Sequence, residues 1–402
     1  MIIRGKNIVI VGLQPWDTEI GSNCKNIALE FSKHNKVLYV NSPMDRITSL
    51  LRKDDHAVKK RLDILKTKTK NIELVHPNLW IFYPDVIIES INWIKINFVF
   101  DILNKLNNKK LAGAILRAVE KLGFEEFILF NDNDIFRSFY LKEYLKPSLS
   151  IYYSRDYLLA VEYWRYHGSR LEPVLMSKSD ICVANSAYLA AICKKYNTNS
   201  YDIGQGCEVD MFLDADKQPM PTDMTGISQP IIGYVGALQS LRLDIEILMH
   251  LAVERPEWKI VLVGPEDEDF KNSDLHRLEN VHFIGSKNPS ELPSFINSFT
   301  ICVNPQLLNE VTIGNYPRKV DEYLAVGKPV VATKTESMDL FSGYVYLADT
   351  KEQYVDFIDL ALNEDNSELT RSRREFASGH TWEASVQKIY DAVSKLWGIA
   401  CS

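Results

Sequence analysis

The stretch that most constrains the fold runs from Asn315 to Thr333 and reads NYPRKVDEYLAVGKPVVAT. Pro317 pre-sets the backbone for the first turn of a helix. The side chains of Val320, Tyr323 and Leu324 follow at the i, i+3 and i+4 positions of one helical face. We therefore expect a short helix after Pro317, with this face buried.

The same stretch predicts where the helix ends and that a strand comes after it. Gly327 ends the helix, and Lys328-Pro329 turns the chain. Residues 330–332, Val-Val-Ala, form a short apolar run that is typical of a buried parallel strand. The unit is thus helix, tight turn and central strand.

Two charged residues in the helix indicate a nucleotide site. Glu322 lies on the side opposite the apolar face, and Lys319 precedes it by three residues. A carboxylate there can accept two hydroxyl hydrogen bonds from a ribose, and a lysine with free helix N-terminal amides suits a phosphate. Spacing alone fits an amphipathic helix with solvated charges equally well.

The run P-x-K-x-x-E-Y-L-A-x-G-K-P-V-V-A-T, residues 317–333, resembles the donor-binding signature of retaining GT-B glycosyltransferases of family 4 (glycosyl transferases group 1), in particular their teichuronic-acid-biosynthesis-like branch. The resemblance implies that Glu322 binds the ribose and that Lys319 lies near the diphosphate. It covers nearly the whole chain, strongly over residues 230–335 and faintly before residue 150.

Composition places the chain among ordinary globular proteins, with 402 residues, 46% hydrophobic and 25% charged, enough for two or three domains. Six scattered cysteines without a C-x-x-C pair favour neither a disulfide framework nor a zinc site. We expect a cytoplasmic protein, and the N-terminus lacks the long apolar region of a signal peptide. No membrane span is expected, because the most apolar later window, residues 86–103, still contains charged residues.

Charge is unevenly distributed along the chain. Residues 1–212 hold 29 Lys and Arg against 24 Asp and Glu, although the net charge of the whole chain is −7. The basic excess lies in residues 46–70, with nine basic residues against three acidic ones, which suits weak contact with an anionic membrane at its inner face. A plain solvated charge run explains it as well.

The N-terminal part opens with a strand at residues 7–12, a helix at 26–34 and a strand at 37–41, a βαβ unit. The loop after the first strand lies where open α/β sheets place their ligand crevice. Gly21 and Ser22 are candidates for that crevice, and the resemblance implies that they face the donor phosphate or the acceptor. Trp16, Asp17 and Asn23 are further candidates.

Two more strands end in polar clusters. Asp132 follows the buried run at residues 127–130, and Asp156 follows the run at 150–153. Both carboxylates are candidates for positioning an acceptor hydroxyl, although turn-forming and capping roles are commoner for Asp. Trp93, Ile94, Phe98 and Ile102 near helical spacing favour a core helix over an acceptor-facing one.

The second half opens with residues 230–236, PIIGYVG, a strand that ends at Gly236 and allows close approach of a phosphate. Arg242 follows and can supply positive charge. The resembling family usually has a second cation about five residues later, which is absent here. Lys319 is therefore expected to substitute, so that Arg242 and Lys319 are the expected catalytic cations.

The resemblance also implies the remaining donor contacts. The nucleobase packs near Gly264 and near residues 286–288, which end at Asn288. Many members of the family carry a glutamate eight residues before the ribose glutamate, where this chain has Gly314. The loop of Thr312, Gly314 and Asn315 is then expected to bind the donor sugar or phosphate through backbone amides.

These observations together predict an α/β protein of GT-B fold, with two Rossmann-like domains facing across a cleft and a C-terminal helix crossing back. The expected parts are an acceptor-side domain at 1–212, a linker at 213–228, a donor domain at 229–385 and a crossover helix at 386–402. The predicted function is transfer of a sugar from a nucleotide sugar to a glycan or lipid-linked acceptor, with retention.

No metal and no cofactor besides the nucleotide-diphosphate sugar are implied, because cationic side chains stabilise the leaving group in this family and no D-x-D pair lies beside the donor signature. No nucleic acid partner is expected. Two alternatives share the same shell: a non-hydrolysing sugar-nucleotide epimerase, and a catalytically silent scaffold that assists a partner transferase.

Overall fold

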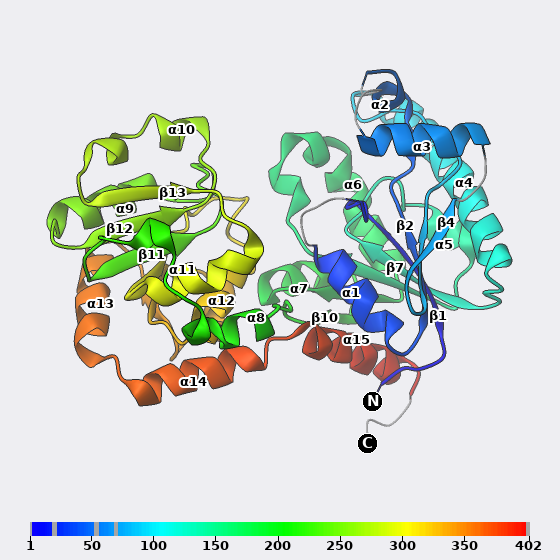
Figure 1. Ribbon diagram of the computed structural model, residues 1–402. Coiled ribbons are helices and arrows are strands. Elements are labelled where there is room, and N and C mark those ends of the chain that lie inside the picture. The colour runs from blue at the N-terminus through cyan, green and yellow to red at the C-terminus, as the bar shows by residue number, and fades with distance from the viewer. Residues whose placement is uncertain (1, 18–21, 52–55, 68–70, 399–402) are drawn as a thin grey trace. The chain divides into compact units, whose positions relative to one another are not determined.

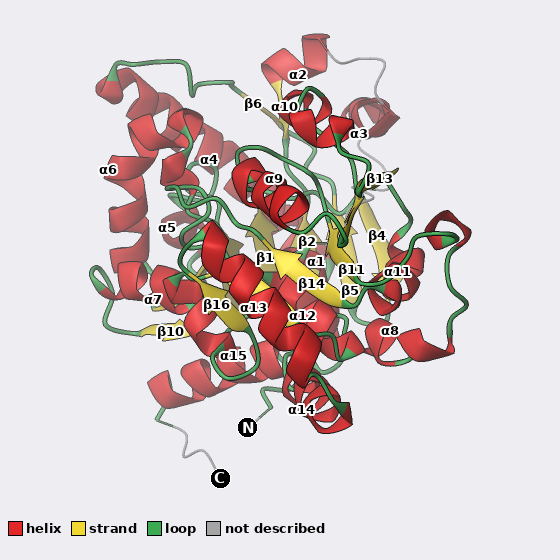
Figure 2. Ribbon diagram, turned by 90° about the vertical axis from the view of Figure 1, so that its left-hand side faces the viewer, coloured by secondary structure: helices red, strands yellow, loops and turns green. Residues whose placement is uncertain are grey.

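The computed structural model describes residues 2–17, 22–51, 56–67 and 71–398. The chain divides into two compact units (Figure 1), the first made of residues 1–204 and 385–402 and the second of residues 205–384. Each unit is an α/β layered structure with helices on both sides of a sheet (Figure 2). No helix in the described ranges combines the length and the apolar character needed to cross a bilayer.

The sheet of the first unit is parallel except for one edge strand, which runs antiparallel to its neighbour β5. In spatial order its described strands are β10 (Ser200–Asp202), β9 (Ile181–Ala184), β8 (Leu149–Ser154), β7 (Phe127–Asp132), β1 (Asn7–Gly12), β2 (Lys36–Val40), β5 (Leu79–Phe82) and β4 (Ile72–His76). The expected βαβ opening is confirmed: α1 (Asn23–Ser32) connects β1 to the parallel strand β2.

The two faces of this sheet bury different residues because side chains alternate along each strand. Val9 and Val11 pack with Leu111 and Ile115 of α4 (Asn97–Lys121). On the other face, Phe31 of α1 packs edge-on against Phe130. Further helices of the unit are α2 (Arg46–Leu51), α3 (His56–Thr67), α5 (Leu141–Leu145), α6 (Glu162–Lys178) and α7 (Ala187–Lys194).

The sheet of the second unit is parallel throughout its described strands. Its order is β13 (Val281–Gly285), β12 (Lys259–Val263), β11 (Ile231–Val235), β14 (Ile301–Asn304), β15 (Val330–Thr333) and β16 (Tyr346–Ala348). One face packs on α11 (Leu292–Ser298) and α12 (Arg318–Val326), and the other on α9 (Ile245–Glu254) and α13 (Lys351–Glu364).

Boundaries between the units differ from the sequence expectation. The first unit ends at Gly204 rather than at residue 212. Residues in the expected linker are packed rather than extended, because α8 (Asp210–Leu213) and the turns after it bury Phe212, Ala215 and Met224 in the core of the second unit. The last helix, α15 (Trp382–Leu396), follows α14 (Ser367–Ser378), and the chain rejoins the first unit from Ser385.

Within the first unit, α15 is fixed by Tyr390. Its ring lies 5.7 Å from that of Phe31, and its hydroxyl accepts a hydrogen bond of 3.0 Å from Asn35. Asn35 also donates to the backbone oxygen of Ile3, so one buried amide holds three segments of the chain.

The expectation that residues 93–102 form core was wrong for most of them. Trp93 and Phe98 are 70% and 73% exposed, and Ile102 is 45% exposed. The reason is where α4 begins: its buried face starts at Phe100 and continues through three asparagines, so the apolar residues before and beside that face remain outside the core. Of the four residues predicted as core, Ile94 packs at the core edge.

Candidate functional site in the second unit

The helix α12 forms as the sequence predicts. It starts after Pro317, ends at Gly327 with φ +90°, and leads into β15. Its burial differs from the prediction, because residues 320–326 are all buried. Glu322 is only 8% exposed and is not a solvated surface charge.

The surroundings of Glu322 explain how a charge is tolerated there. Burial raises the pKa of Glu322, and the positive charges of Arg318 and Lys319 oppose this shift. Arg318 donates a hydrogen bond of 3.1 Å from Nε to Glu322 Oε1. Sequence reasoning missed Arg318, although its i, i+4 spacing to Glu322 is the spacing of helical ion pairs.

Lys319 packs against the glycine turn after β11. An added Cβ at Gly236 would lie 2.1 Å from Lys319 Cε and 2.6 Å from Nζ. The Lys319 ammonium lies 4.8 Å from the ring centre of Tyr234, whose strand leads into that turn. The structure thus brings Gly236 and Lys319, predicted separately, into direct contact.

The neighbouring glycine is equally constrained. Gly264 follows β12, and an added Cβ there would lie 1.9 Å from the backbone oxygen of Gly236. Both glycines have positive φ, +142° for Gly236 and +150° for Gly264, which side-chain-bearing residues rarely adopt. Two bare backbone turns therefore meet beside the Lys319 ammonium, an arrangement that lets a phosphate approach closely.

Arg242 lies in the loop between β11 and α9 and is exposed. Its backbone oxygen accepts from the N–H of Leu307, and the side chain of Asn309 donates to the oxygen of Leu241. The arginine loop is thereby held against the segment that precedes Thr312.

The loop of Thr312, Gly314 and Asn315 is an internally bonded turn. Thr312 is 1% exposed, and its N–H donates to Asn309 Oδ1 at 3.1 Å. The N–H of Ile313 donates to the oxygen of Asn309, and that of Asn315 to the oxygen of Thr312. The N–H groups of Thr312, Ile313 and Asn315 are thus already used within the chain, so this geometry does not support donor binding by these three amides. Gly314 is buried.

Asn288 is an exposed residue with a capping role. Its backbone N–H and its side-chain amide both donate to Glu291 Oε2, at 3.0 and 2.9 Å.

Two N–H groups at the N-terminus of α12 already have partners within the chain. Arg318 N–H donates to the oxygen of Tyr316, and Val320 N–H donates to the oxygen of Pro317.

A second buried carboxylate, that of Asp321, lies next to Glu322 in the sequence and was not predicted to belong to the site. Asp321 is 0% exposed and its Oδ1 lies 2.6 Å from Nδ1 of His380. Burial raises the pKa of Asp321, whereas His380 lowers it. The two residues are 59 positions apart, so nothing in local spacing could have indicated the pair.

Candidate residues in the first unit

Asp132 ends β7 and is fully buried. Its carboxylate lies 3.5 Å from Arg155 Nε, which also lies 3.2 Å from the half-exposed carboxylate of Asp156. Burial raises the pKa of Asp132, and Arg155 opposes the shift. The structure therefore joins the two predicted aspartates through an arginine that sequence reasoning left out.

The loop after β1 is described only in part. Ser22 is the N-cap of α1, and its hydroxyl accepts from Lys25 N–H at 3.2 Å. Asn23 donates to the Tyr153 hydroxyl at 3.3 Å, and Asp17 accepts from Arg61 at 2.7 Å. Gly21 lies outside the described residues.

The candidate donor site matches a known protein family. Residues 229–362 match the profile of the family described as glycosyl transferases group 1. The matched residues all lie within the second unit. The matched residues include Gly236, Arg242, Gly264 and Glu322, so the predicted resemblance to glycosyl transferases group 1 is confirmed over the part of the chain that holds the candidate donor site.

A curated relative extends the similarity. The putative teichuronic acid biosynthesis glycosyltransferase TuaH of Bacillus subtilis (strain 168) is 26% identical over 234 residues, which are 55% of this chain and 59% of TuaH. The match thus spans less than two thirds of that relative.

Solved structures share the fold over nearly all of the chain. Anabaena Alr3699/HepE in complex with UDP superposes with a TM-score of 0.66 at 14% identity, covering 97% of this chain and 100% of HepE. Sucrose-phosphate synthase from Thermosynechococcus elongatus gives 0.67 at 15% identity, covering 99% and 100%. The predicted GT-B fold class is therefore confirmed, since structural neighbours of this kind are GT-B glycosyltransferases.

Proposed function

We propose that the protein is a retaining glycosyltransferase of family 4 that transfers a sugar from a UDP-sugar to a glycan or lipid-linked acceptor in cell-surface polysaccharide biosynthesis. One observation carries the proposal: the glycosyl transferases group 1 match includes the paired glycine turns and the α12 carboxylate that suit a nucleotide sugar. Support for the donor comes from HepE, which was solved with UDP and with UDP-glucose.

Chemically, each group has a distinct task in this proposal. The Glu322 carboxylate accepts hydrogen bonds from the ribose hydroxyls, in competition with Arg318. Lys319 meets the diphosphate at the bare turns of Gly236 and Gly264. Arg242 adds positive charge from its exposed loop. Negative charge grows on the departing nucleotide as the glycosidic bond breaks, and these cations stabilise it without a metal ion.

The acceptor and the setting of the reaction are proposed from a relative and from surface charge. TuaH is described as acting in teichuronic acid biosynthesis, which favours a surface polysaccharide as the product. The exposed cations of α3 favour work at the inner face of the cytoplasmic membrane. Asp132 and Asp156 are proposed to position the acceptor hydroxyl through their shared contact with Arg155.

Kinetics of Lys319→Ala and Arg242→Ala test this function. UDP release from a panel of UDP-sugars, measured with membrane extract as acceptor source, should fall more than UDP affinity does, because both cations act on charge that grows in the transition state. Lys334→Ala, a surface lysine 3.7 Å from Asp349, serves as the control.

Product analysis separates the alternatives. Mass spectrometry that finds an epimerised nucleotide sugar without any glycosylated acceptor would identify an epimerase. UDP binding with no product of either kind would identify a silent scaffold. Unchanged turnover in both alanine variants would remove the two cations from the mechanism.

A further inference from the structure

A cavity of about 520 Å³ opens in the first unit beside the two-stranded sheet of β3 (Met44–Asp45) and β6 (Ile87–Ile88). We call it the β3–β6 pocket. Its walls come from the start of α2, the loop at 88–93, α4, the turn at 134–137 and the start of α6. Its size lies within the range of small-molecule sites, roughly 300–1,000 Å³.

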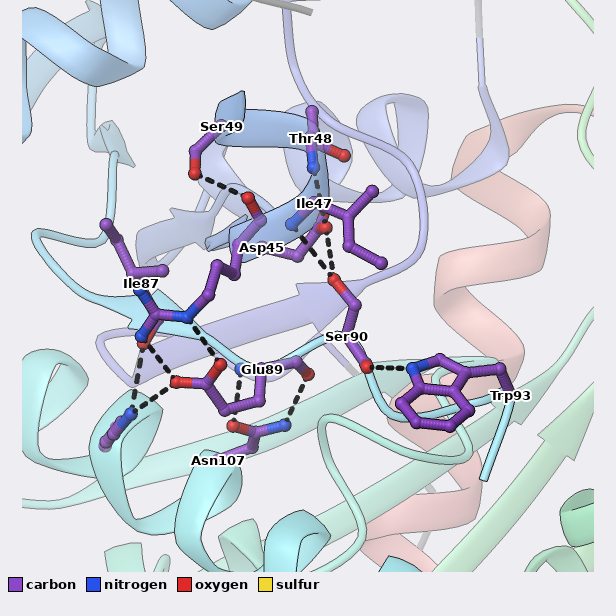
Figure 3. A network of polar contacts seen from close by, with 11 residues as sticks. Asp45, Ile47, Thr48, Ser49, Ile87, Glu89, Ser90, Trp93 and Asn107 are labelled. Atoms are coloured by element: carbon purple, nitrogen blue, oxygen red, sulfur yellow. Dashed lines mark hydrogen bonds and ion pairs between the residues drawn. The ribbon is translucent and has the colours of Figure 1, made fainter. Parts of the chain in front are cut away.

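A polar network that includes the lining residues Asp45, Glu89, Ser90 and Asn107 borders the β3–β6 pocket (Figure 3). Arg46 donates two hydrogen bonds of 2.7 Å to the Glu89 carboxylate and so ties α2 to the segment after β6. These contacts hold the pKa of Glu89 at about 2. Asn107 of α4 exchanges hydrogen bonds of 2.8 and 2.9 Å with the backbone of Glu89. These contacts connect α2, α4 and the segment after β6 on this side of the pocket.

Asp45 brings a negative charge to the lining of the β3–β6 pocket. Burial alone would raise the pKa of Asp45, but hydrogen bonds from the Ser90 hydroxyl at 2.6 Å and the Thr48 N–H at 3.0 Å lower it. The carboxylate is thus ionised at neutral pH. An anionic group in the β3–β6 pocket would be repelled by it.

The cation that lines the pocket is already engaged. Arg137 donates to the Asp134 carboxylate at 2.7 Å and to the oxygen of Gly12 at 3.2 Å. A phosphate site needs an available cation or a row of amides. Among the described lining residues, the chemistry therefore favours an uncharged ligand rich in hydroxyls over a phosphate.

Aromatic side chains complete the lining. Trp93, Tyr163 and Trp164 contribute ring surfaces, and Asn92 contributes an amide. Trp164 is held by stacking on Phe136 at 5.2 Å, and the Trp93 indole N–H donates to the Ser90 oxygen at 2.9 Å (Figure 3). Flat apolar rings beside hydrogen-bonding groups match the two faces of a sugar ring, one apolar and one polar.

Exposed apolar side chains follow the lining residue Trp93 along the chain, on α4. Trp93 lines the pocket and is 70% exposed, and Phe98, Ile102 and Leu106 follow at four-residue spacing on α4 with exposures of 73%, 45% and 51%. Residues at this spacing share one helix face. Contiguous exposed apolar surface of this kind marks an interaction site.

We propose that the β3–β6 pocket binds an uncharged sugar ring of an amphipathic acceptor, whose apolar chain lies on the Phe98–Ile102–Leu106 stripe. This inference rests on the proposed glycosyl transfer and names the class of its acceptor. Sugar and chain have separate contact surfaces, so each part can be tested by itself.

Ligand-observed NMR on the full chain can measure both parts. The probes are octyl glycosides of glucose, galactose and N-acetylglucosamine below their micelle concentrations, the corresponding methyl glycosides, and octanol. At least one octyl glycoside should bind, its methyl glycoside should bind more weakly, and octanol should bind least. Binding by none of the glycosides, or equal binding of octanol, would overturn the proposal.

Three variants locate the binding. Trp93→Ala should weaken an octyl and a methyl glycoside alike, by roughly five- to tenfold, the range expected for one aromatic contact. Phe98→Ala should weaken only the octyl glycoside. Tyr196→Ala, which removes a 46% exposed ring elsewhere in the first unit, should change neither. Equal losses in all three variants would mean adsorption to apolar surface and would overturn the assignment.

UDP binding in the same samples keeps this test apart from the proposed function. If UDP fails to bind while a glycoside binds in the Trp93-dependent way, the donor site is wrong and the β3–β6 pocket stands. If UDP binds and no glycoside does, the transferase proposal stands and the acceptor class is wrong.

Discussion

Lys319 lies in the space that any side chain at residue 236 would need. Its Cε would be 2.1 Å from a Cβ on Gly236, and its ammonium is held over the ring of Tyr234. A side chain at position 236 would therefore displace the end of Lys319, a residue 83 positions later in the chain. The lysine position in turn depends on that glycine.

Gly236→Ala should therefore reduce UDP affinity, by roughly tenfold or more, because Lys319 must leave the turn. Calorimetric titration of UDP measures the loss. Gly343→Ala is the matched control: φ is +88° there and no atom lies within 4 Å of the added Cβ. It carries only backbone strain of about 1–2 kcal/mol and should bind UDP as the wild type does.

Glu322→Ala should weaken UDP binding by about 1.5–3 kcal/mol, or tenfold or more, since the ribose loses a charged acceptor. Glu375→Ala is the control, because Glu375 also pairs with an arginine at i, i+4, Arg371, but on the exposed face of α14. Circular dichroism should show both variants folded. Unchanged UDP affinity in Glu322→Ala would exclude this carboxylate from the site.

The sequence was sufficient to predict α12 and β15 because Pro317 and Gly327, which flank the helix, determine where it begins and ends. The burial of Glu322 was not predictable in this way, since it depends on packing against other segments. Arg373 and Arg374 of α14, for example, donate to the backbone oxygens of Gly327 and Val326. Helical periodicity contains no information about such a neighbour.

The first unit shows the same limit. The apolar runs in the sequence predicted strands that end at Asp132 and near Asp156. The contact of both aspartates with Arg155 depends on the register of β7 on β8, which places Asp132 beside Tyr153. Burial of Phe98 and Ile102 was predicted wrongly because apolar residues have the same spacing on a buried helix face and on an exposed one.

Stability should depend on pH through Glu172. Burial raises the pKa of Glu172 to about 7, even though the Tyr152 hydroxyl donates to it at 2.7 Å and lowers it. The folded state thus binds this proton more tightly than the unfolded state. The contribution of protonated Glu172 to the free energy of unfolding is fully present below the ordinary glutamate pKa of about 4.3. It is lost as pH rises through 7, a change on the order of 3 kcal/mol.

Urea unfolding at pH 5 and pH 8 measures that change. Glu172→Gln should flatten the pH dependence because the neutral amide mimics the protonated acid. Glu162→Gln, an exposed position in the same helix, should leave the dependence as in the wild type. A slope that persists in Glu172→Gln would assign the effect to another group.

Weak binding to anionic vesicles is the last prediction, and the structure changes which cations should cause it. Lys60 donates to Glu73 and to the Tyr83 hydroxyl, and Arg61 pairs with Asp17 at 2.7 Å, so both hold the fold together. Lys59 and Lys66 are exposed and seven residues apart on one face of α3. Each cation near an anionic surface contributes about 1 kcal/mol.

Co-sedimentation with phosphatidylserine vesicles should therefore appear at low salt and fade as the Debye length falls to about 8 Å near physiological ionic strength. Lys59→Gln/Lys66→Gln should weaken it. The control Lys36→Gln/Lys121→Gln removes the same charge at the amino edge of the sheet, at the start of β2 and the end of α4. It should not weaken vesicle binding. Equal weakening by both pairs would mean that net charge alone governs attraction, and salt-insensitive binding would mean that the apolar stripe on α4, rather than α3, meets the lipid.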